Sequence, residues 1–108
     1  MKTGPLWKKG NTGKWDKRYF KLSKDSFMYF KSLASTAPKK VILCTDLLRI
    51  VPSEDTRTFS VVMKQKTSYL RAINAKDCLE WIHELTLAIE DNINGFVLQG
   101  NLIDRCTY

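Results

Sequence analysis

The sequence has few cysteines and histidines, and their spacing fits neither a disulfide framework nor a CxxC zinc site. Its three cysteines, Cys44, Cys78 and Cys106, are odd in number and far apart, which argues against paired thiols and against a CxxC metal site. We therefore expect reduced cysteines in a cytosolic protein. The single histidine, His83, has no Ser-His-Asp partners, and no glycine-rich phosphate loop is present. We expect neither catalysis nor a bound cofactor.

Long hydrophobic runs are also missing. No stretch of 18 apolar residues exists, so we expect no segment that crosses a bilayer. The first residues lack the apolar middle of a signal peptide. The chain has 108 residues, of which 44% are hydrophobic, and this is enough for one domain with one core.

Acidic residues are scarce in the first part of the chain. Residues 1–40 hold eleven Lys or Arg and two acids, whereas residues 41–108 hold seven basic and nine acidic side chains. Such an uneven charge favours an anionic partner, which could be a lipid, a nucleic acid or an acidic protein. The alternative is that the lysines only keep strand faces soluble.

Two runs around a Gly/Asn/Thr turn, between Leu6 and Leu22, alternate with the period of a β-strand. In the second run, Asp16 and Arg18 share a face with Phe20 and Leu22; in the first, Lys8 shares a face with Leu6. An apolar face must be buried, so the cations nearest the turn should lie where the core opens to water. Cations on adjacent strands there could bind a multiply charged anion.

Further short runs follow at a spacing of roughly ten residues, separated by turn signals, and predict more strands. They cover residues 27–30, 39–44, 47–51, 58–63 and 67–72, with a loop over 31–38 and a turn at 45–46. Seven short strands with short polar connections are typical of an antiparallel sandwich or barrel.

The period then changes to that of a helix over residues 75–92. Asn74 is the expected N-cap, with Asp77 three residues later. An apolar stripe follows at spacings of three and four: Cys78, Trp81, Ile82, Leu85 and Ile89. One helix cannot bury this stripe alone, so we expect the helix to cap one open end of the sheet. Trp81 should be the largest side chain that it buries there.

Residues 93–108 form a C-terminal extension of unknown role. Asn94-Gly95 and Gly100-Asn101 are turn signals, and the short apolar pieces between and after them could fold back on the sheet or dock a neighbouring region.

The order of these segments resembles a pleckstrin homology (PH) domain over residues 3–92. The resemblance rests on Gly4-Pro5-Leu6-Trp7-Lys8-Lys9-Gly10, on Trp15-Asp16-Lys17-Arg18-Tyr19-Phe20-Lys21-Leu22, on the aromatic run 27–30, and on Trp81 in the late helix. It implies a mainly β fold, in which a seven-stranded, antiparallel, partly open barrel or sandwich is capped at one end by a C-terminal α-helix.

The resemblance also implies a phosphoinositide headgroup site between the first two hairpins. Carried over by position, its residues are Lys8, Lys14, Arg18, Tyr29 and Lys39 or Lys40. Arginine would grip two phosphate oxygens, lysine would act as a point charge and tyrosine as a neutral donor. The alternative for Arg18 is an ion pair with Asp16 that only positions the hairpin.

Asp16 departs from the family's pattern, because strong 3-phosphoinositide binders carry a basic residue two positions before the arginine. A carboxylate there should repel phosphate, so we expect modest affinity or selectivity. Lys9 and Lys17 should lie on the outer face and add nonspecific membrane attraction. Trp7 should also face outward, where it would either insert at the lipid interface or pack against a neighbouring loop.

Three functions follow in order of preference. The first is a non-catalytic, membrane-targeting module for phosphoinositides or other anionic lipids, cytoplasmic and peripheral at the membrane. The second is a protein–protein interaction module for an acidic or small-GTPase partner, with weak lipid binding. The third, nucleic-acid binding, is not expected, because the one strong helix is acidic.

Overall fold

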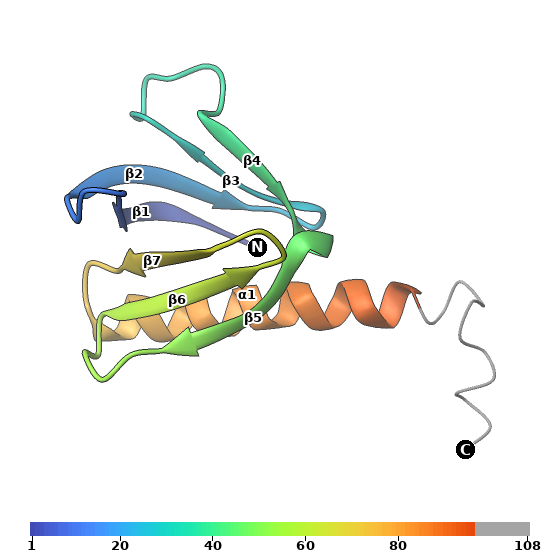
Figure 1. The fold of residues 1–108 in the computed structure, drawn as a ribbon. Coiled ribbons are helices and arrows are strands. Elements are labelled where there is room, and N and C mark those ends of the chain that lie inside the picture. The colour runs from blue at the N-terminus through green and yellow to red at the C-terminus, as the bar shows by residue number, and fades with distance from the viewer. Residues whose placement is uncertain (97–108) are drawn as a thin grey trace, which may run out of the picture.

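The computed structural model describes residues 1–96, which form one sheet and one long helix (Figure 1). The sheet has seven antiparallel strands in the order β4-β3-β2-β1-β7-β6-β5. These strands are β1 (Lys2–Lys9), β2 (Trp15–Leu22), β3 (Ser26–Phe30), β4 (Lys40–Leu43), β5 (Leu47–Pro52), β6 (Thr58–Met63) and β7 (Thr67–Arg71). The edge strands β4 and β5 are not paired with each other, so the barrel is partly open and the expected fold class is confirmed.

The period-2 alternation of β1 and β2 places the residues as predicted. Leu6, Phe20 and Leu22 are almost fully buried on the inner face of the sheet, and Arg18 lies directly across from Leu6. The rings of Phe27 and Tyr29 each pack on Phe20, with centroids 5.1 and 5.0 Å apart. The inner face is therefore an aromatic core that ends in cations toward the β1–β2 turn.

Helix α1 (Ala75–Phe96) packs against β5 and β6 and covers the core (Figure 1). It begins as predicted, because the Asp77 backbone N–H donates a hydrogen bond of 2.8 Å to Oδ1 of Asn74. Trp81 has no exposed surface, and its ring lies 6.1 Å from that of Phe27. A Cβ at Gly4 would lie 3.8 Å from Trp81, which is an ordinary van der Waals contact, so the indole lies close beneath β1 at this position.

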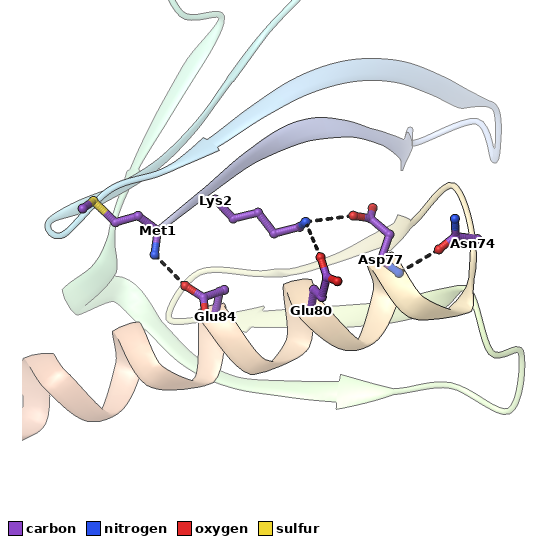
Figure 2. Close-up of polar contacts among 6 residues, drawn as sticks. All are labelled: Met1, Lys2, Asn74, Asp77, Glu80 and Glu84. Atoms are coloured by element: carbon purple, nitrogen blue, oxygen red, sulfur yellow. Dashed lines mark hydrogen bonds and ion pairs between the residues drawn. The ribbon is translucent and has the colours of Figure 1, made fainter.

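The first residues of the chain are joined to α1 by ion pairs (Figure 2). Nζ of Lys2 lies 2.9 Å from Oδ1 of Asp77 and 3.0 Å from Oε1 of Glu80, and 5.3 Å from the centre of the Trp81 ring. The amine of Met1 pairs with Glu84. These contacts attach the start of β1 to the helix, and Glu80 and Glu84 are the acidic partners in two of them.

Several boundaries differ from the prediction, including those of the fourth strand and the end of the helix. Cys44, expected at the end of the fourth strand, begins the short 3-10 helix η1 (Cys44–Asp46). Cys44 is buried, and its backbone N–H donates a hydrogen bond to the carbonyl of Asp25, in the turn before β3. Asn94 and Gly95, expected to form a turn, lie in the last turn of α1. A glycine costs a helix only about 1 kcal/mol relative to alanine, which is too little to end it by itself. The expected turn at Gly100-Asn101 lies outside the described residues.

Candidate functional site

Lys8 is the centre of the cations on the inner face. It lies across from Asp16 on β2 and from Leu70 on β7, and it is half-buried. Burial lowers the pKa of Lys8, and the positive charges of Lys66, Lys40 and Arg18 lower it further, while Asp16 opposes them. The ammonium is therefore poorly solvated and surrounded by like charge, which is the condition in which an anion is attracted most strongly.

Arg18 lies near this ammonium without a carboxylate partner of its own. Its Nη1 donates a hydrogen bond of 3.0 Å to the Lys17 carbonyl, and within residues 1–96 it forms no ion pair with Asp16. The carboxylate of Asp16 instead lies 3.9 Å from Nζ of Lys14. The structure therefore does not contain the alternative Arg18–Asp16 ion pair, and the guanidinium is available to bind an anion.

Tyr29 and Lys40 complete the inner side of the site. They lie across from each other in the β3–β4 ladder, and Tyr29 is buried with its ring on Phe20. Lys39 precedes the strand, and its backbone N–H donates to the Tyr29 carbonyl. Of the two lysines proposed as alternatives, Lys40 is the one whose charge is among the main causes of the lowered pKa of Lys8.

Lys66, in the turn between β6 and β7, is a member that sequence reasoning missed. Its charge lowers the pKa of Lys8 more than that of any other residue. Sequence reasoning missed it because nothing in the turn itself indicates that this turn approaches β1. We name Lys8, Arg18, Lys40 and Lys66 the inner cation cluster.

Lys14 lies in the β1–β2 turn, where its ammonium faces Asp16. The turn is closed by backbone hydrogen bonds from Gly10 to Lys14 and from Gly13 to Gly10, and Gly13 has a positive φ of 87° that favours glycine. Lys14 is exposed and faces Asp16, so the two charges partly neutralise each other at the edge of the site.

The outer face of the same strands carries aromatic rings, each with a cation over it. Nζ of Lys17 lies 5.5 Å from the centre of the Trp7 ring and 5.7 Å from that of Tyr19. Nζ of Lys9 lies 5.9 Å from the centre of the Tyr69 ring. Trp7, Lys9 and Lys17 thus face outward as predicted, and their membrane role stays a prediction.

Other kinds of site find little support in residues 1–96. No three His, Cys, Asp or Glu side chains within this range are grouped closely enough to hold a metal ion. His83 is exposed on α1. No helix in the described part of the chain is both long and apolar enough to span a bilayer.

Comparison with known proteins agrees with this geometry. The family model of the PH domain matches residues 1–90. The human pleckstrin homology domain-containing family A member 2 is 29% identical over 99 residues, which cover 83% of this chain and 23% of that protein. This chain therefore spans about a quarter of the length of that relative.

Solved structures share the fold. The PH domain of human oxysterol binding protein-related protein 11 is 28% identical with a TM-score of 0.73, and 83% of this chain and 80% of that chain are covered. The C-terminal PH domain of pleckstrin, solved in complex with D-myo-Ins(1,2,3,5,6)P5, is 23% identical with a TM-score of 0.74, and 82% and 94% are covered. With its open seven-stranded sheet, its single late helix and the match over residues 1–90, the chain belongs to the PH domain family.

Proposed function

We propose that this PH domain is a non-catalytic module that binds the phosphorylated headgroup of a phosphoinositide through the inner cation cluster. The observation that carries the proposal is the environment of Lys8, whose pKa is lowered by burial and by Lys66, Lys40 and Arg18. Bringing four cations together on one side of a core costs free energy in the empty protein. A multiply charged phosphate ester removes that cost, because each cation gains an opposite charge.

Each residue has a distinct part in this binding. Arg18 offers a fork to two phosphate oxygens, since no carboxylate of residues 1–96 forms an ion pair with it. Lys8, Lys40 and Lys66 act as point charges, and the Tyr29 hydroxyl is the neutral donor beside Lys40. Lys14, which faces Asp16, and Lys39, which precedes Lys40, would add further positive charge around the headgroup.

Asp16 sets the limit on affinity. It is the only carboxylate in the seven strands, and it lies on the inner face across from Lys8. A phosphate that reaches Lys8 approaches this negative charge as well. The proposal is therefore modest affinity for a singly or doubly phosphorylated headgroup, with the protein held peripherally at a cytoplasmic leaflet.

Two solved structures of similar fold support the proposal that this site binds a phosphate ester. One structure of similar fold, the C-terminal PH domain of pleckstrin, was solved with an inositol pentakisphosphate, and another, the Slm1 PH domain, with phosphoserine. Both ligands are phosphate esters, the chemistry that the inner cation cluster suits.

The experiment is sedimentation with liposomes that differ only in a few per cent of phosphoinositide, together with calorimetric titration of soluble inositol phosphates. Arg18→Ala should weaken headgroup binding by roughly ten- to a hundredfold, the loss of one charge-assisted bond. Lys24→Ala, which removes an exposed cation from the β2–β3 turn, is the matched control and should change little. Binding that follows total liposome charge and is equal for both variants would contradict the proposal.

A further inference from the structure

A hollow of about 410 Å³ lies on the outer face of β1, β2 and β3, on the side of the sheet away from the inner cation cluster. Its floor is Pro5, Tyr19 and Phe30, which the strand registers place side by side. Its wall is the loop after β3, where a turn between Ser32 and Ser35 holds Leu33 with 80% of its surface exposed. The lining is mostly apolar.

Lysines flank this hollow along β2. Lys17, Tyr19 and Lys21 occupy alternate positions, so they share the outer face, and Lys21 itself lines the hollow. Alternate residues of a strand are about 6.6 Å apart, so the two lysines are separated by about 13 Å with Tyr19 between them. Lys17 is held against the rings of Trp7 and Tyr19, which restricts where its ammonium can be.

No negative charge on the strands balances these lysines. The single strand carboxylate, Asp16, is on the inner face. Further along the outer face are Lys9 over Tyr69 and Arg71 over Trp15. Of these two cations, only Arg71 has a carboxylate of residues 1–96 nearby, Asp55 at 3.9 Å. The surface therefore combines one apolar hollow with a row of cations.

We propose that this outer face docks an extended acidic segment of a partner protein, with the pattern acidic–x–apolar–x–acidic. The apolar side chain enters the hollow beside Pro5 and Leu33. The acidic side chains, four residues apart and hence about 13 Å apart in an extended chain, reach Lys17 and Lys21. Charge complementarity and this shared spacing identify the partner's chemistry.

An anionic membrane suits this surface less well. A membrane presents headgroups in a plane, whereas the hollow is recessed between the strands and the loop that carries Leu33. A fatty acid would fill the hollow but would satisfy only one of the two flanking lysines. An extended peptide supplies the apolar group and both anions together.

The test uses a fluorescent peptide, Gly-Ser-Glu-Ser-Phe-Ser-Glu-Ser-Gly, with binding followed by anisotropy and by amide shifts in the ¹⁵N-labelled protein. We expect shifts at Tyr19, Lys21 and Leu33 and none at Lys8. The isomer Gly-Ser-Ser-Glu-Phe-Glu-Ser-Ser-Gly has the same charge with the wrong spacing. It should bind at least about fivefold more weakly, as should a peptide with serine in place of phenylalanine.

Matched variants of the protein separate this site from the headgroup site. Lys21→Glu and Leu33→Ser should each weaken binding of the first peptide by about fivefold or more and leave binding of soluble inositol phosphate unchanged. Lys24→Glu, with the same change of charge in the neighbouring turn, should have less than about half that effect on peptide binding.

Several results would overturn the proposal. These are equal binding of the two isomeric peptides, equal loss in Lys21→Glu and Lys24→Glu, competition of the peptide with inositol phosphate, or no shift on the outer face at millimolar peptide. Loss of binding to anionic vesicles in Lys21→Glu, without any peptide binding, would assign the surface to a membrane instead.

Discussion

Asp16 lies directly across from Lys8 in the β1–β2 ladder, with both side chains on the inner face of the sheet. We predict that Asp16→Asn strengthens binding of inositol phosphates by about three- to tenfold, because it removes the repulsion of one carboxylate. Calorimetric titration measures the change. Asp25→Asn, the same charge change in the exposed β2–β3 turn, is the control. An equal gain in both variants would mean that only net charge matters.

Lys8→Met should separate stability from binding. The pKa of Lys8 is lowered, so the folded state disfavours its charge, and this penalty is present at neutral pH and relieved as pH rises above the folded pKa. The variant should melt a few degrees higher, a gain of about 1 kcal/mol or less, yet bind headgroup roughly ten- to a hundredfold more weakly. Thermal melts and titrations show both effects. The control Lys9→Met, on the outer face, should change neither the melting temperature nor headgroup binding. A Lys8→Met protein that melts at a lower temperature than the wild type would refute this account.

Lys66→Ala tests the residue that the sequence did not reveal. Removing its charge should weaken headgroup binding by about three- to tenfold and raise the pKa of Lys8 toward its ordinary value. NMR titration of the lysine side chains follows the pKa directly. Lys64→Ala is the matched control, because Lys64 lies in the same turn but faces Asp46 at 3.8 Å. If Lys64→Ala has the larger effect, Lys66 does not belong to the site.

Lys2→Met should loosen the attachment of β1 to α1. Burial opposes the charge of Lys2, but the hydrogen bonds to Asp77 and Glu80 outweigh it and raise the pKa. A raised lysine pKa stabilises the fold below about pH 10.5, its ordinary value, and that stabilisation is lost as pH rises through the folded pKa. The variant should unfold about 1–2 kcal/mol more easily at pH 7, between the values for exposed and buried pairs.

Denaturant unfolding at a series of pH values measures this effect. The difference between wild type and Lys2→Met should narrow above about pH 10.5, whereas Lys76→Met, an exposed lysine on the first turn of α1, should show no such difference. A gap that stays constant to the highest pH would mean that packing, rather than the charge of Lys2, holds the strand to the helix.

Trp81→Ala should cost roughly 3–5 kcal/mol of stability, because the indole is fully buried. The buried Nε1 has no hydrogen-bond partner within residues 1–96, so Trp81→Phe loses volume but no hydrogen bond. It should cost only about 1–2 kcal/mol. Chemical denaturation compares the two. Equal costs would show that the N–H, rather than the ring, is needed.

Period and order in the sequence were enough to predict the fold, whereas the assignment of the site residues stays a prediction. Leu6, Phe20 and Leu22 follow strict alternation, and the stripe through Trp81 follows helical spacing. Each pattern therefore indicated one type of secondary structure and one buried face. Lys66 could not be found in this way, because its approach to Lys8 depends on how β7 is placed beside β1. The bonds of Asp77 and Glu80 to Lys2 were missed for the same reason, since they join residues more than 70 positions apart.

The position of the first strand between β2 and β7, and beneath α1, has a consequence for how the chain matures. During synthesis, β1 can pair with β2 early, but its other edge and its anchor at Lys2 must wait until residues 67–84 have left the ribosome. Until then the inner surface that holds Leu6 and Phe20 stays open to water, and such late, distant pairings make folding slow. The emerging chain is therefore most prone to aggregation just before residues 67–84 leave the ribosome.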